Sequence, residues 1–284
     1  MVLTHISYTT ISTSIKMIEM LSYEFMQNAF IAGFIIAILA SVSGTFVVLR
    51  RYSMISETLA HSALVGVAVG LVAGLNPLWM AVVVALLSAW LIEYLRSSFS
   101  LYSDSILAIL LSGSLAVAVI IVSLGGSFNN SLFSYLFGSI LSVSNEDVIV
   151  ILVVGTASLV LLLAFSKELY FIAYDEEVAQ TSGIKVKLLN FLLVSVVAII
   201  IALSIRVVGS LLIGALMVIP TVSALQFKLG FAKTTLLALL FALISVAAGM
   251  TLSYEFSLPS GATIVLCVLG IFIISLVLNN VKKA

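Results

Sequence analysis

Long apolar stretches separated by short polar turns follow one another along almost the whole chain. A helix that spans a bilayer needs about 20 mostly apolar residues. The pattern predicts an all-α, polytopic transmembrane helical bundle of about nine spans, within a range of eight to ten. The expected spans are 27–49, 58–75, 77–95, 105–124, 147–166, 188–205, 207–226, 232–253 and 260–279.

Two of these spans leave the exact count open. The span after Glu57 is short and begins with polar residues. The pair around Arg206 is either two spans or one span followed by a broken or re-entrant helix, which membrane proteins tolerate where it lines a cavity.

The composition agrees with a chain surrounded by membrane lipid and by its own helices. Hydrophobic residues make up 63% of the 284 residues and charged residues 8%, and the mean hydropathy is +1.34. Soluble domains carry about 25% charged residues. The net charge of +0 excludes the basic face that a nucleic-acid partner would need. The lone Cys267 excludes an internal disulfide and a cysteine-cluster metal site.

Residues 1–24 differ from the rest of the chain. They lack the basic start, apolar run and cleavage site of a signal peptide. Apolar and polar residues mix at helical spacing over Ile11–Tyr23, which favours a short interfacial segment over a disordered tail. Residues 25–284 are then expected to form one transmembrane domain.

Basic residues gather on one side of a nine-span arrangement. Cytoplasmic loops are enriched in Lys and Arg, so this side is expected to be cytoplasmic. The chain is then a multi-pass protein of the cell (plasma) membrane, with its N-terminus outside and its C-terminus in the cytoplasm. Arg206 and Lys16 fall on the other side. The residues on the cytoplasmic side are Arg50, Arg51, Arg96, Lys167, Lys185, Lys187, Lys228, Lys233, Lys282 and Lys283.

Glu57 and His61 are the clearest ionisable pair deep in a span, and on a continuous helix they are expected toward mid-membrane. They are four residues apart, so their side chains share one face of a helix. Carboxylate and imidazole together are ligands for zinc, and carboxylates also suit manganese. The pair is either such a metal site or a hydrogen-bonded pair that only fixes packing. Weak coordination suits a conduit, because an ion that is held too firmly cannot leave.

A stripe of glycines follows on the same helix. Gly66, Gly70 and Gly74 recur every four residues, a spacing that lets a second helix approach closely. The stripe points roughly opposite to Glu57 and His61. We therefore expect one face to pack and the other to line a path.

The stretch 167–187 carries the densest charge of the chain. Within it, Asp175 can cap a short helix, Glu176 and Glu177 favour its positive end, and Gly183 can end it. The stability of so short a helix is marginal in isolation. We therefore expect it to dock against a partner, with Ala179 or Gly183 allowing close approach. A helix lying on the membrane surface is the alternative. Glu93 and Arg96 are expected to form a surface ion pair.

Several stretches, in this order, resemble the permease subunits of ABC importers for zinc and manganese, which share an architecture with cobalamin and siderophore permeases. The likeness covers about residues 25–280. The stretches that carry it are Val47–Gly70 with Thr58-Leu59-Ala60-His61-Ser62, then Tyr135–Ser139 with Asn145-Glu146-Asp147, then Asp175–Gly183, then Val208–Pro220, and Pro259–Ala262.

The resemblance implies three partners: a second copy of this subunit, a cytoplasmic ATP-binding subunit and an extracytoplasmic metal-binding protein. The ATP-binding subunit is expected on the 167–187 loop, with contacts at Asp175, Glu177, Ala179 and Gly183. It also implies metal ligands at Glu57 and His61. The family usually has Asp at the position of Glu57, and zinc importers often carry another histidine in the span 105–124, where this chain has Ser112-Gly113-Ser114.

The sequence therefore indicates a permease for a divalent metal ion, zinc before manganese, with no permanently bound cofactor. The alternatives are an ABC permease for a metal chelate and a proton-coupled secondary transporter. A membrane enzyme is disfavoured because the chain has no H-E-x-x-H or G-x-S-x-G motif. It also has no P-loop, so we expect ATP hydrolysis in a separate subunit.

Overall fold

The computed structural model describes residues 22–99, 102–124 and 130–281, and these form helices joined by short turns. Eight of the helices in this part of the chain are long and apolar enough to cross a membrane. They are α2 (Glu24–Leu49), α3 (Met54–Ala73), α4 (Pro77–Ser98), α5 (Ser103–Leu124), α7 (Asn145–Ala164), α10 (Val186–Val208), α12 (Phe231–Phe256) and α13 (Ser260–Val281). The shorter elements are α6 (Asn130–Phe137), the 3₁₀ turn η1 (Ile140–Ser142), α8 (Ser166–Tyr174), α9 (Glu176–Thr181) and α11 (Ile213–Leu225).

The predicted all-α bundle is confirmed, and the ninth expected span, 207–226, is the short helix α11. It has 13 residues, against 20 to 26 for the long helices. The preceding helix α10 runs through Arg206 to Val208, and the chain then leaves helical geometry at Gly209, whose φ is +89°. The region is therefore one full span followed by a broken helix, the arrangement that the sequence left open.

The break has a local cause. A Cβ atom at Gly209 would stand 2.4 Å from the carbonyl oxygen of Leu136, so only glycine fits there. After the bend, Ser210 N–H donates to Tyr135 O at 2.8 Å and Leu211 N–H to Leu136 O at 3.2 Å. The unpaired carbonyl groups of the last turn of α6 thus accept hydrogen bonds from the N–H groups of the bend between α10 and α11.

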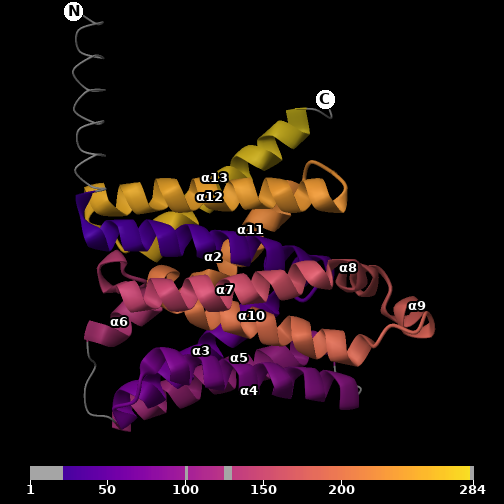
Figure 1. Ribbon diagram of the computed structural model, residues 1–284, viewed down its shortest axis with the longest axis horizontal. Helices are drawn as coiled ribbons and strands as arrows, with labels where there is room; N and C mark the ends of the chain where they lie inside the picture. The colour runs from indigo at the N-terminus through magenta and orange to yellow at the C-terminus, as the bar shows by residue number, and fades with distance from the viewer. Residues whose placement is uncertain (1–21, 100–101, 125–129, 282–284) are drawn as a thin grey trace, which may run out of the picture.

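The helices run roughly side by side, and Figure 1 shows α8 and α9 at one end of the bundle and α6 at the other. We call these the α9 end and the α6 end. The central helices are α2, α3 and α10, of which 72%, 78% and 72% of the membrane-spanning window is buried, against 22–33% for the other long helices. The helix that carries the candidate ligand residues, α3, is therefore one of the central helices of the bundle.

The glycine stripe of α3 lies against α4. A Cβ atom at Gly66 would stand 2.3 Å from Met80 O, and one at Gly70 would stand 2.7 Å from Pro77 Cα. The two backbones are in direct contact, as small residues permit. Gly74 does not belong to this contact and is a correction to the expected stripe. It caps the C-terminus of α3 with a φ of +66°, and a Cβ atom there would meet nothing within 4 Å.

The expected interfacial segment 1–24 lies outside the described residues except for its last three. Of these, Glu24 is already the first residue of α2.

Candidate metal path and loop network

Glu57 and His61 lie one turn apart near the start of α3. His61 Nε2 stands 3.5 Å from Glu57 Oε1, and the side chains are 8% and 35% exposed. The other imidazole nitrogen, Nδ1, is buried without a hydrogen-bond partner within the described part of the chain. The pair therefore shares one face, and it keeps donor atoms that the protein does not satisfy.

The first turn of α11 faces the carboxylate of Glu57. A Cβ atom at Gly214 would stand 2.8 Å from Glu57 Oε2 and 3.3 Å from Ser56 Oγ. The unpaired N–H groups at a helix N-terminus carry partial positive charge and attract anions. The break after α10 therefore brings a positive helix end to the acidic side chain, a feature that the sequence pattern did not reveal.

Helix α5 covers another side of α3. Thr58 Oγ1 donates to Leu107 O at 3.2 Å, and Ser62 Oγ lies 2.9 Å from Ser114 Oγ. Ser114 belongs to the polar stretch at which a further histidine was absent from the sequence. At this point α5 thus presents a hydroxyl group to α3, and a hydroxyl is a weaker metal ligand than an imidazole.

The donor set suits a transported divalent ion more than a resident one. Within the described ranges, no group of three or more His, Cys, Asp or Glu side chains could hold a metal ion. A structural zinc site uses four ligands. The pair in one chain supplies two, and a site of low ligand number suits passage.

The 167–187 loop contains two short helices. The expected helix is α9, and Asp175 caps it by accepting a hydrogen bond from Val178 N at 3.0 Å. Glu177 and Val178 are exposed on its outer surface. Gly183 follows the helix with a φ of +86° and open space around it. The preceding helix α8 was not expected.

Ala179 was expected to touch a partner, and the structure corrects this. Its side chain is 0% exposed and belongs to the core of the chain itself. A methyl group that is already covered cannot contact a protein docked from outside. It anchors α9 to the bundle instead.

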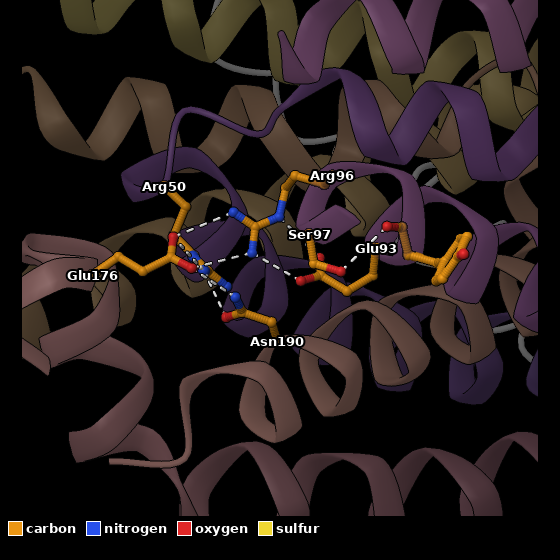
Figure 2. A network of polar contacts seen from close by, with 7 residues as sticks. Arg50, Glu93, Arg96, Ser97, Glu176 and Asn190 are labelled. Atoms are coloured by element: carbon orange, nitrogen blue, oxygen red, sulfur yellow. Dashed lines mark hydrogen bonds and ion pairs between the residues drawn. The ribbon is translucent and has the colours of Figure 1, made fainter. Parts of the chain in front are cut away.

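Glu176 ties α9 to three membrane helices (Figure 2). Its carboxylate accepts hydrogen bonds from Arg96 Nη1 and Nη2 on α4, at 3.3 and 3.1 Å. It also accepts one from Asn190 Nδ2 on α10 at 3.0 Å, and Arg50 Nη2, at the end of α2, lies 3.7 Å away. Arg50 donates in turn to Asn190 Oδ1 at 2.7 Å.

Glu93 completes this cluster, which we call the Glu176 network: Arg50, Glu93, Arg96, Glu176 and Asn190. Glu93 accepts from Arg96 Nη2 at 2.8 Å and its side chain is 2% exposed, so the expected surface ion pair with Arg96 is in fact buried. The role of Asn190 was missed because no local sequence signal pairs a residue of the second turn of α10 with the start of α9.

Burial and the neighbouring charges of the network shift the pKa values of Glu176 and Arg50. Burial by itself would raise the pKa of Glu176, but the hydrogen bonds and charge of Arg96, with Arg50 and Asn190, hold that pKa below its ordinary value of 4.5. Burial lowers the pKa of Arg50, although Glu176 opposes the effect. Glu176 is thus an ionised carboxylate at neutral pH.

Three of the sequence stretches that carried the resemblance meet at the α6 end. Besides the contacts of Ser210 and Leu211 with α6, Ser260 Oγ donates to Val207 O at 3.0 Å. Arg206 pairs with Asp147 of α7 and donates to the Tyr135 hydroxyl at 3.3 Å. The ordered motifs therefore form one junction in space, a relationship invisible in their spacing.

Residues 22–279 match the sequence profile of the ABC 3 transport family. The chain belongs to the ABC 3 transport family. Three curated relatives are full-length matches. The chain is 36% identical to a probable metal transport system membrane protein of Treponema pallidum over 93% of this chain and 99% of that protein. It is 31% identical to the high-affinity zinc uptake system membrane protein ZnuB of Haemophilus influenzae, over 89% and 97%. It is 30% identical to the manganese import system permease protein ScaB of Streptococcus gordonii, over 89% and 91%.

A solved structure shows the same fold. The chain resembles one in the structure of PsaBC from Streptococcus pneumoniae in complex with Fab, with a TM-score of 0.82 and 30% identity, over 92% of this chain and 94% of that one.

Proposed function

We propose that this chain is the membrane-spanning permease subunit of an ATP-driven divalent metal-ion importer. The observation that carries the proposal is the Glu57–His61 pair, which offers a carboxylate beside an imidazole with a buried, unpaired nitrogen on the central helix α3, in a member of the ABC 3 transport family. The relatives named for zinc uptake and manganese import support a bare divalent cation as the cargo.

Zinc is the first candidate and manganese the second. An imidazole nitrogen is a good ligand for zinc, whereas manganese prefers oxygen donors. Glu57 contributes oxygen to either metal. The buried, unpaired Nδ1 of His61 favours zinc.

The open ligand set also supports a homodimer. Glu57 is 35% exposed, and the spanning window of α5 beside it is only 22% buried in the single chain. A second copy covering this side would shield the path from lipid and add donor atoms. An extracytoplasmic metal-binding protein then delivers the ion at the α6 end.

The ATPase docks at the α9 end, which is the cytoplasmic end in this proposal. Arg50, Arg51 and Arg96 lie at this end, as the positive-inside rule requires. The docking surface consists of the exposed residues Glu177, Val178 and Gly183 with Tyr174, which is 84% exposed.

The test is uptake by proteoliposomes that hold this chain with its ATPase subunit. Zinc and manganese are offered separately, with ATP, with a non-hydrolysable analogue, and with a proton gradient alone. Uptake of a bare ion that needs ATP hydrolysis supports the proposal. Uptake that a proton gradient drives without ATP would establish a secondary transporter, and uptake only of a chelated metal would establish a chelate permease.

A further inference from the structure

The helix α9 is too short to hold its own position. A helix of six residues is unstable in isolation, so its place on the bundle depends on contacts with other elements. The main ones are the buried methyl group of Ala179 and the carboxylate of Glu176. The first is a packing contact with the core. The second is directional, because hydrogen bonds to ionised groups have defined geometry and are the stronger ones.

The partners of Glu176 lead to α3 by two routes. Arg50 caps α2, and the turn from Arg50 to Ser53 connects it to α3, in whose first turn Glu57 lies. Arg96 lies near the end of α4, and the backbone of α4 touches that of α3 at Gly66 and Gly70. Both routes end on the helix that carries Glu57 and His61.

These contacts behave as rigid links. At Gly66 a Cβ atom would meet backbone atoms of Met80 and Ala81, so α3 and α4 cannot slide without separating. Tyr52, in the turn between α2 and α3, is 9% exposed, which fixes that turn in the core. Glu176 is therefore the polar contact through which a displacement of α9 reaches Arg96 and Arg50, and through them α3.

We propose that Glu176 is the positioning residue that transmits the movement of the docked ATPase from α9 to α3, and so to the metal ligands Glu57 and His61. The inference rests on the proposed function and deepens it. Glu176 is 40% exposed on its side chain and faces inward to the network, whereas the neighbouring Glu177 is exposed on the docking surface. One residue holds the bundle and the next meets the partner.

The experiment measures metal uptake and ATP hydrolysis in the same proteoliposomes, so that their ratio gives the coupling. In the Glu176→Gln complex, the ATPase subunit stays bound and hydrolyses ATP. Uptake per ATP falls about tenfold or more, which is the factor expected when an interaction with an ionised group is lost. The matched control is Glu168→Gln on α8, which removes a carboxylate outside the network and keeps the wild-type ratio.

A second variant covers the case in which Glu176→Gln fails to assemble. Glu176→Asp keeps the charge but is one methylene shorter, so it cannot reach Arg96, Arg50 and Asn190 together, and its ratio also falls. A purely structural role would lower the amount of complex and reduce uptake and hydrolysis equally.

The outcomes separate the inference from the function on which it rests. Wild-type complexes that couple, with an unchanged ratio in either assembled Glu176 variant, overturn the inference alone. Wild-type complexes that take up no metal with ATP overturn both.

Discussion

Gly214 lies so close to Glu57 that a Cβ atom at residue 214 would stand 2.8 Å from Glu57 Oε2. The contact joins the first turn of the broken helix α11 to the acidic ligand candidate of α3. Because the atom that it would meet is the end of a flexible side chain, a methyl group at residue 214 would displace the carboxylate more readily than the fold.

Gly214→Ala is therefore expected to impair transport without unfolding the protein. Metal uptake should fall about tenfold, equivalent to ~1.4 kcal/mol of lost ligand interaction, while the melting temperature of the purified complex stays within a few degrees of wild type. The control is Gly113→Ala on α5, where a Cβ atom meets nothing within 4 Å. Equal uptake by both variants would show that the position of the Glu57 carboxylate does not matter.

Removing either ligand candidate should abolish metal uptake. Glu57→Gln replaces the charged carboxylate with a neutral amide and His61→Ala deletes the imidazole, and uptake should fall at least about 100-fold, since the loss of second-shell partners alone costs 10–100-fold. Assembly with the ATPase is expected to persist, which co-purification checks. Glu146→Gln, an exposed carboxylate at the α6 end, is the control. Transport at the wild-type rate in either ligand variant would mean that the pair only fixes packing.

Gly66→Val should destabilise the α3–α4 contact. The added atoms would meet Met80 O and Ala81 Cα, which are backbone atoms and cannot move aside, so overpacking should cost about 1–3 kcal/mol. Thermal unfolding of the protein in detergent measures the loss. Gly270→Val on α13, where nothing lies within 4 Å, is expected to melt like wild type. Similar melting of the two variants would contradict the close approach of the helices.

Val178→Arg should weaken docking of the ATPase. Val178 is 46% exposed on α9, so a charged side chain there is tolerated by this chain but disrupts an apolar contact with a partner. Co-purification of the ATPase subunit should be lost, while the variant keeps its own melting temperature. Glu168→Arg on α8 is the comparison. Ala179 cannot serve in this test because its side chain is buried in the chain itself. An assembled and active Val178→Arg complex would place the docking site elsewhere.

The Glu176 network should lose its contribution to stability in acid. The pKa of Glu176 is lower in the folded protein than its ordinary value of 4.5, so its contribution is fully present above pH 4.5 and disappears as the pH falls through the folded-state pKa. The difference in melting temperature between wild type and Glu176→Gln should therefore be constant above pH 4.5, shrink as the pH falls further, and vanish only below the lowered pKa of Glu176. A difference that disappears between pH 5 and 7 would contradict the ionised carboxylate.

The amino-acid sequence by itself determined the elements that depend on local chemistry. Apolar runs long enough to span a bilayer predicted the helical bundle, and the capping residue Asp175 predicted α9, because both signals lie within a few residues of the structure they specify. The four-residue spacing of Glu57 and His61 fixed their common face for the same reason.

Only the tertiary structure decided which distant groups meet. The break at Gly209 depends on the backbone of α6, and it is this break that carries Gly214 to Glu57. Burial of Ala179 and the convergence of Arg50, Arg96 and Asn190 on Glu176 depend on how α2, α4 and α10 are arranged around the loop. In a chain this apolar, helical periodicity carries little information about which face points inward, since lipid and core are both apolar. Direct contacts between elements therefore set the site and its connection to the loop.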